Sequence, residues 1–151
     1  MSSHVGSCHC GAVKVHTELD PILTGQCNCT SCRKLSGSVV FVGFYVKDEI
    51  VFTHDEPLKS YEYVGGSSGK MTRFVCPRCF SSMAAEIEVF PGFIGVPTGI
   101  FDDAENFAPS YEVFTQSKLP FLSDNGCIKN RYGDKPIQDE ISLLMKALEE
   151  R

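Results

Sequence analysis

The sequence lacks the features that would place the protein in a membrane, outside the cell or on nucleic acid. No apolar run approaches the roughly 20 residues that a membrane-spanning helix needs, and Met1 to Val5 lack the apolar segment of a secretion signal. Basic residues are outnumbered, with 14 Lys and Arg against 19 Asp and Glu, which gives a net charge of −5. An acidic protein repels phosphates. We therefore expect no membrane partner, no nucleic-acid partner and a cytoplasmic location, with the nucleus as a second compartment.

Cysteine, in contrast, is abundant. Seven of the eight cysteines fall into three clusters, which are Cys8-His9-Cys10, Cys27-Asn28-Cys29-Thr30-Ser31-Cys32 and Cys76-Pro77-Arg78-Cys79. In a reducing compartment such clusters indicate metal ligands before they indicate disulfides. A Cys-x-x-Cys turn folds the chain back so that two thiolates reach one metal ion. Disulfides or buried free thiols are the alternative.

The spacing divides the seven cysteines into two zinc sites, so we predict two Zn²⁺ ions per chain. A structural zinc takes four ligands and no water, and the two outer pairs supply them: Cys8, Cys10, Cys76 and Cys79. This site would tie the N-terminal strand to a strand far along the chain. Cys27, Cys29 and Cys32 then hold a second, catalytic zinc with an open fourth position.

A second purely structural zinc, closed by a histidine or by Cys127, is the alternative for the middle cluster. His9 is the nearest histidine in the sequence, but it lies inside the first cysteine pair. We expect His4, His16 and His54 to be surface residues, and Cys127 to be an ordinary free thiol.

The hydrophobic pattern predicts a mainly β fold with a short C-terminal helix. Short runs rich in Val, Phe, Tyr and Ile are separated by Gly, Pro and Asp. The expected strands are residues 12–16, 38–46, 49–53, 58–64, 70–75, 82–89 and 111–115. Gly65 to Gly69 reads as a flexible surface loop, and the segment after Cys29 as a single helical turn. Ile137, Ile141, Leu144, Met145 and Leu148 recur at helical spacing. We predict one compact, zinc-stapled domain, with a β domain over residues 1–135 and a helix over residues 136–151 packed on it.

At its cysteines the sequence resembles the glutathione-dependent formaldehyde-activating enzyme family, which includes centromere protein V. The matching stretches are Gly6 to Gly11, Cys27 to Lys34 with Gly37 following, Phe74 to Cys79 and, more weakly, Gly99 to Asp103. The resemblance implies the same division of the cysteines and a fold of paired β-sheets like that of the mammalian suppressor of Sec-four. It also implies carbon–sulfur lyase chemistry, the reversible addition of glutathione to formaldehyde.

Three positions depart from the family pattern. Phe80 stands where the family usually has Gly, so we expect a different local turn there. Asn28 stands where His is frequent, which removes a possible proton shuttle, and Phe121 stands where Trp is common.

The ligands of the middle cluster favour thiol chemistry. Zinc with three thiolates is a poorer Lewis acid than zinc with three histidines, and it suits a soft fourth ligand such as the thiolate of glutathione. A small thiol is therefore the expected partner. Arg33 and Lys34 follow the cluster and would offset its charge or hold a substrate carboxylate. Asp102 and Asp103 would bind a substrate amine or simply form a turn.

Three other functions compete with the lyase. The main alternative is a non-catalytic zinc-binding interaction domain, which a flat apolar surface without a pocket at the second site would favour. A nucleic-acid-binding zinc module needs a basic face that the charge balance does not supply. A thiol-redox protein is a further alternative, although the lack of a βαβ pattern argues against a thioredoxin-like one.

Overall fold

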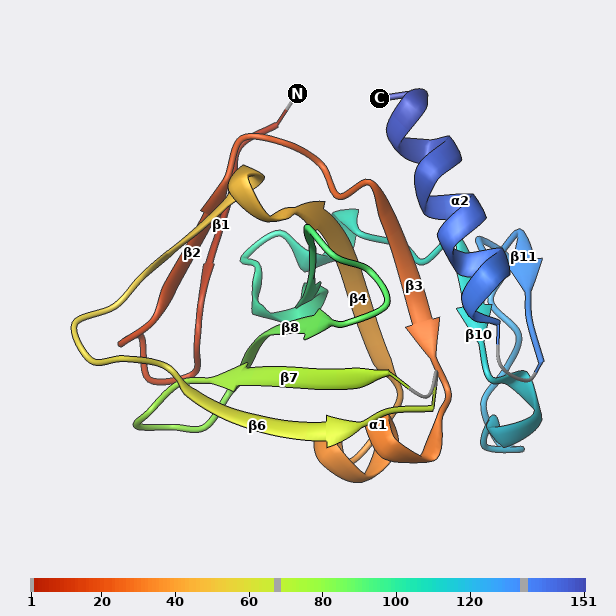
Figure 1. Cartoon of the computed structure of the whole chain (residues 1–151), viewed down its shortest axis with the longest axis horizontal. Helices are drawn as coiled ribbons and strands as arrows, with labels where there is room; N and C mark the ends of the chain where they lie inside the picture. The colour runs from red at the N-terminus through yellow and green to blue at the C-terminus, as the bar shows by residue number, and fades with distance from the viewer. Residues whose placement is uncertain (1, 67–68, 134–135) are drawn as a thin grey trace.

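A computed structural model describes residues 2–66, 69–133 and 136–151. It has a mainly β fold, as the sequence predicted, with two α-helices (Figure 1). A three-stranded sheet has the order β1-β2-β5, with β1 at His4–Ser7, β2 at Lys14–Thr17 and β5 at Ile50–Thr53. An eight-stranded sheet has the order β11-β10-β3-β4-β9-β8-β7-β6. Its strands are β3 (Leu23–Cys27), β4 (Val40–Val46), β6 (Lys59–Val64), β7 (Lys70–Val75), β8 (Ser82–Ile87), β9 (Phe93–Pro97), β10 (Tyr111–Val113) and β11 (Asn130–Arg131).

The α-helices are α1 (Thr30–Ser36) and α2 (Ile137–Glu149), and four short 3₁₀ helices complete the described elements. These are η1 (Lys47–Glu49), η2 (Thr98–Ile100), η3 (Ala104–Asn106) and η4 (Thr115–Ser117). No helix in the described parts of the chain is long and apolar enough to cross a membrane.

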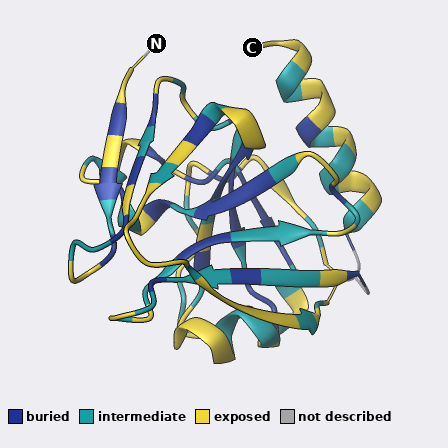
Figure 2. Ribbon diagram, turned by 60° about the vertical axis from the view of Figure 1, so that its left-hand side comes forward, coloured by how far each residue is buried: buried dark blue, intermediate teal, exposed yellow. Residues whose placement is uncertain are grey.

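The large sheet is covered on both faces. Successive side chains of a strand point to opposite faces, so Tyr45 and Phe44 of β4 enter different cores. Tyr45 packs with Val15 of the small sheet and with Val96, whereas Phe44 packs with Tyr111 and with Leu144 of α2. Figure 2 shows the buried residues along the central strands and the exposed residues along the outer side of α2. The second core surrounds the pocket described below.

Helix α2 lies where its apolar spacing predicts. Ile137, Ile141, Leu144 and Leu148 pack against the large sheet, but Met145, predicted as part of the same face, is 44% exposed. The predicted boundary between residues 135 and 136 adjoins residues 134–135, which lie outside the described residues, so this division stays a prediction. Residues 67–68 of the predicted glycine-rich loop also lie outside them.

Several elements were not predicted from the sequence pattern. Strands β1, β3, β9 and β11 were not predicted, and the turn expected after Cys29 is the seven-residue helix α1. Strand β3 (LTGQC) buries Thr24 and Gln26, and β9 (FIGVP) carries Gly95 and Pro97, so neither shows the usual strand composition. Their position inside the sheet, rather than their own residues, makes them strands.

The prediction that His4 is a surface residue is wrong. Its side chain is 3% exposed and lies between two carboxylates, with Nδ1 at 2.7 Å from Asp103 Oδ2 and Nε2 at 2.7 Å from Asp20 Oδ1. Burial alone would lower the pKa of His4, but the hydrogen bonds and charges of Asp20 and Asp103 raise it above its ordinary value of 6.5. His4 thus connects β1 to two loops that are distant in sequence.

This arrangement predicts a pH-dependent contribution to stability. Because the pKa of His4 is raised in the folded protein, its stabilisation is complete below pH 6.5 and is lost as the pH rises through the raised value. We expect the difference in unfolding temperature between the wild type and His4→Gln to be largest near pH 6 and to shrink towards pH 9. Thermal unfolding followed by circular dichroism across this range measures it. A difference that stays constant or grows with pH would contradict the assignment.

Candidate functional site

The structure brings the seven cysteines into two spatial clusters. The first cluster, Cys8, Cys10, Cys76 and Cys79, joins the turns of two hairpins. Cys8 and Cys10 lie between β1 and β2 of the small sheet, and Cys76 and Cys79 lie between β7 and β8 of the large sheet. Backbone N–H groups approach the sulfurs, as in Val13 N–H to Cys8 Sγ at 3.3 Å. The distances are 3.6 Å from Cys8 Sγ to Cys10 Sγ and 3.8 Å from Cys10 Sγ to Cys76 Sγ. Two sulfurs bound tetrahedrally to one zinc at about 2.3 Å would lie about 3.8 Å apart, so these four residues fit a metal ion.

A different local turn was predicted at Phe80, which follows this cluster, and this prediction is wrong. Its φ is 61°, in the left-handed region that glycine favours, and its N–H donates to the carbonyl of Cys76 at 3.0 Å. The turn that suits glycine is therefore kept by a residue with a Cβ, which costs about 1–2 kcal/mol. Lys59 Nζ lies 5.0 Å from the Phe80 ring centroid, and the ring is 60% exposed.

Relief of this backbone strain is testable. Asn tolerates the left-handed conformation better than Phe does, so Phe80→Asn should stabilise the protein by about 1 kcal/mol. Phe121→Asn is the matched control, because Phe121 is also an exposed phenylalanine and is not among the residues with positive φ. Urea unfolding of both variants measures the effect. A loss of stability in Phe80→Asn, or an equal gain in both variants, would contradict the strain argument.

The second cluster is local. Cys27 ends β3, Cys29 is the N-cap of α1, and Cys32 lies in the first turn of α1, with its N–H donating to Cys29 Sγ at 3.2 Å. The three sulfurs lie within 4.8 Å of one another, and no other His, Cys, Asp or Glu among the described residues joins them. These are soft donors of the kind that zinc binds.

Each thiol of this cluster shifts the pKa of its neighbours. Hydrogen bonds from Cys27 and Cys32 lower the pKa of the Cys29 thiol to about 3. The same bond to Cys29 raises the pKa of the Cys27 thiol well above its usual range. One thiolate is therefore stabilised by its neighbours, and a bound cation would be needed to keep all three deprotonated.

The second cluster opens into a pocket on the α2 side of the large sheet. Its floor includes Gly25, Val42 and Phe44, and its lining is mainly apolar. Gly25 is required here, because a Cβ at this position would lie 2.5 Å from the Tyr111 ring. The pocket wall formed by β6, β7 and β8 carries three polar side chains. The buried Arg73 donates to Ser82 Oγ at 2.9 Å and to Tyr63 Oη at 3.3 Å.

Helix α2 contributes Ile137 and Glu140 to the same pocket. The buried Tyr111 hydroxyl donates to Glu140 Oε1 at 3.0 Å. Burial raises the pKa of the Glu140 carboxyl to about 7, although this hydrogen bond acts in the opposite direction.

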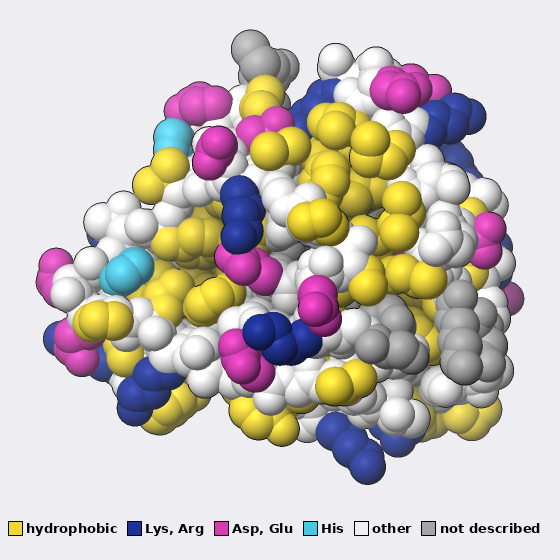
Figure 3. All heavy atoms as spheres, viewed as in Figure 1, with side chains coloured by type: hydrophobic (Ala, Val, Ile, Leu, Met, Phe, Trp, Pro, Cys, Tyr) yellow, Lys and Arg dark blue, Asp and Glu magenta, His cyan; other side chains and the backbone are white. Residues whose placement is uncertain are grey.

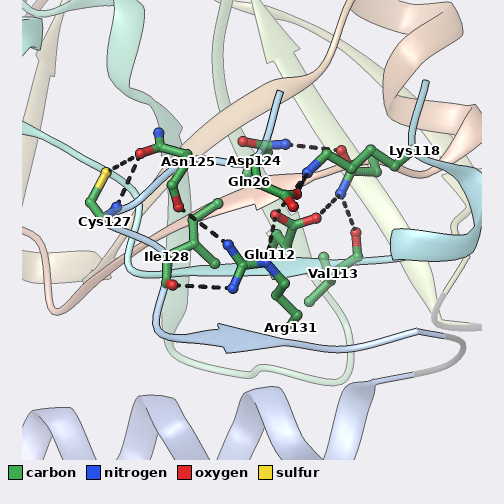
Figure 4. A network of polar contacts seen from close by, with 10 residues as sticks. Gln26, Glu112, Val113, Lys118, Asp124, Asn125, Cys127, Ile128 and Arg131 are labelled. Atoms are coloured by element: carbon green, nitrogen blue, oxygen red, sulfur yellow. Dashed lines mark hydrogen bonds and ion pairs between the residues drawn. The ribbon is translucent and has the colours of Figure 1, made fainter. Parts of the chain in front are cut away.

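A polar network surrounds the buried Glu112 (Figure 4). Glu112 of β10 is fully buried, and Figure 4 shows Lys118 and Arg131 pointing toward it. Lys118 Nζ lies 3.3 Å from Glu112 Oε2 and Arg131 Nε lies 3.7 Å from it. Asn28 donates through Nδ2 to Glu112 Oε1 at 3.3 Å and to the Val113 carbonyl at 3.1 Å. Asn28 thus anchors the segment between Cys27 and Cys29 to β10.

The other predicted site residues lie apart from this pocket. Arg33 is half-buried and Lys34 is exposed on α1, and neither is among the side chains that line the pocket. Their predicted contact with substrate stays a prediction. Asp102 and Asp103 form a turn, and Asp103 binds His4. Cys127 and His9 are exposed and belong to neither cluster.

Arg73 is the cationic residue of the pocket lining, and the sequence analysis did not identify it. Its neighbours in β7 are the polar Thr72 and the apolar Phe74, so no regular alternation indicates which face Arg73 lies on. Only its contacts with Tyr63 of β6 and Ser82 of β8 show that this face is buried.

A mainly β chain with two cysteine clusters, each able to hold a metal ion, is thus the class of protein that the fold and the site define. The model of the glutathione-dependent formaldehyde-activating enzyme family matches residues 3–117, and the chain belongs to this family. The matched segment includes both clusters and ends before α2.

Among solved structures, the crystal structure of a Rhodobacter sphaeroides protein has a similar fold. Its TM-score is 0.50 at 16% sequence identity, over 85% of this chain and 98% of the other. The likeness concerns the fold alone. A comparison with curated proteins gives no significant match.

Proposed function

We propose that the protein is a zinc-dependent carbon–sulfur lyase that acts on adducts of a small thiol, such as glutathione, with formaldehyde or another small carbonyl compound. One observation carries the proposal: three cysteines converge at a pocket, and no fourth protein ligand among the described residues completes their site. A site open to a pocket supports an enzyme over the alternative, a non-catalytic zinc-binding interaction domain.

The two clusters have different roles in this proposal. Cys8, Cys10, Cys76 and Cys79 would hold a structural zinc that fastens the small sheet to the large one, and Cys27, Cys29 and Cys32 would hold the second. A zinc ion on three thiolates would accept a soft fourth ligand and keep a bound thiol deprotonated but nucleophilic. All eight cysteines are free, which suits a reducing compartment such as the cytoplasm.

The chain's own residues would bind and orient the thiol adduct. The apolar side chains of Val42 and Phe44 line the pocket and would limit the access of water to a reacting group bound there. Lysines and arginines are interspersed with acidic residues on the face shown in Figure 3, so this face has no basic stripe for nucleic acid.

Cobalt substitution tests the proposal directly. Glutathione added to the protein with cobalt at both clusters should change the intensity and energy of the cobalt–thiolate absorption. Cys127→Ser is the matched control and should respond like the wild type, because Cys127 lies outside both clusters. Cys32→Ser should lose the response. An unchanged spectrum with saturating glutathione would overturn the proposed thiol site.

A further inference from the structure

Arg73 is a buried cation with no carboxylate partner among the described residues. It lies on β7, it is 8% exposed, and its two hydrogen-bond partners, Tyr63 and Ser82, are both neutral. No carboxylate among the described residues forms an ion pair with it. A buried charge without a counter-ion costs several kcal/mol, so a binding role explains its place better than a stabilising one.

The guanidinium also has an unused donor. The Arg73 Nε atom is buried and has no hydrogen-bond partner among the described residues, which is costly for a charged group. The Tyr63 and Ser82 hydroxyls accept from Arg73 and therefore each keep a proton to donate. Arg73, Tyr63 and Ser82 all line the pocket. Together they offer the charge and the N–H and O–H groups that a carboxylate binds.

This polar wall belongs to the same pocket as the second cysteine cluster. The residues that line it include Cys27, Cys29 and Cys32 together with Arg73. The positive charge of Arg73 acts to lower the pKa of the Cys32 thiol. A molecule whose sulfur lies at the cluster therefore shares the pocket with one cationic side chain, that of Arg73. The rival explanation is that Arg73 only balances the negative charge of a three-thiolate zinc site, and this rival predicts no preference among bound thiols.

We propose that Arg73, with Tyr63 and Ser82, forms an anion subsite that binds a carboxylate of the substrate whose sulfur lies at Cys27, Cys29 and Cys32. This inference rests on the proposed function. It makes the substrate class a carboxylate-bearing thiol or thiol adduct, and it makes Arg73 a specificity-determining residue. The carboxylate can belong to the thiol or to the carbonyl part of the adduct.

The experiment compares thiols of one shape that differ in charge. The cobalt-substituted protein is titrated with 3-mercaptopropionate and with its neutral isostere 3-mercaptopropionamide, and the cobalt–thiolate absorption is followed. A second arm uses 2-mercaptoethanol with glyoxylate or with formaldehyde. In both mixtures the thiol sulfur bonds to the aldehyde carbon and its proton passes to the oxygen, so only one of the two adducts carries a carboxylate.

In at least one arm the wild type should bind the anionic ligand about tenfold more tightly than the neutral one. Arg73→Gln should abolish this preference while changing the affinity for the neutral ligand little. Arg73→Lys keeps the charge without the planar fork and should keep part of the preference, so it serves if the glutamine variant fails to fold. Lys129→Gln, which removes an exposed charge outside the pocket, should behave like the wild type.

The outcomes separate the two proposals. If the anionic and the neutral ligand bind with equal affinity in both arms, or if Arg73→Gln keeps the preference for the anionic ligand, the anion subsite is wrong and the thiol site stands. Loss of the preference in Arg33→Gln or Lys34→Gln, but not in Arg73→Gln, would also overturn it and return the role to α1. If no thiol changes the spectrum, the proposed function itself fails and the subsite fails with it.

Discussion

Replacing Cys76 with serine should unfold the protein, whereas replacing Cys32 with serine should leave it folded. Cys76 is fully buried and belongs to the cluster that joins the two sheets. Structural zinc sites contribute on the order of 10 kcal/mol in small domains, which is comparable with the whole stability of a domain, about 5–15 kcal/mol. The cluster of Cys27, Cys29 and Cys32 spans only the end of β3 and the start of α1, so its loss frees little of the chain.

Thermal unfolding and metal content measured on the same samples test this asymmetry. Cys32→Ser should lose the metal of one site with a small change in unfolding temperature, and Cys76→Ser should show no cooperative transition near that of the wild type. Cys127→Ser controls for the removal of a thiol, because Cys127 is exposed and lies outside the clusters. Similar losses of stability in Cys76→Ser and Cys32→Ser would contradict the division of roles.

Removal of the Glu112 carboxylate should have the second largest effect. Glu112→Ala would remove the buried partner of the Lys118 ammonium and of the Asn28 amide, leaving them only the exposed Asp124 and the Val113 carbonyl. Breaking a buried charged pair from one side costs about 3 kcal/mol. Because Asn28 lies between Cys27 and Cys29, we also expect weaker cobalt binding at their cluster and unchanged binding at the other.

Two further variants make this prediction specific. Glu112→Gln keeps an acceptor for Asn28 but not the charge, so its stability in urea should lie between those of the wild type and Glu112→Ala. Asp124→Asn removes an exposed carboxylate that also contacts Lys118 and should change neither stability nor cobalt binding. Equal effects of Glu112→Ala on the two clusters would mean that the network does not position Asn28.

The sequence was sufficient to predict what depends on residue type and spacing. Cysteines at zinc-ligand spacing separated the two clusters, and the structure brings together the same two sets. Short runs of β-forming residues bounded by Gly, Pro and Asp predicted β4 and β7, and helical spacing predicted α2. These signals are local, so they survive without knowledge of the fold.

Features that depend on distant segments could not be predicted. His4 is buried because Asp20 and Asp103 converge on it from two loops, and nothing near His4 in the sequence indicates this. Arg73 becomes a pocket residue only when the fold brings β6, β7 and β8 to the same pocket as the second cluster. Phe80 shows a different limit, because the turn follows the hydrogen bond to Cys76 rather than the preference of the residue.

Cadmium-113 NMR of the protein loaded with two cadmium ions most directly tests the claim that one cluster is closed and the other is open. Cadmium takes the place of zinc, and its resonance depends strongly on how many sulfurs bind it. The account predicts two resonances, one that is typical of four thiolates and does not move with glutathione, and one that shifts toward the four-thiolate range as glutathione is added. A single resonance, or two resonances that both stay in place, would contradict it.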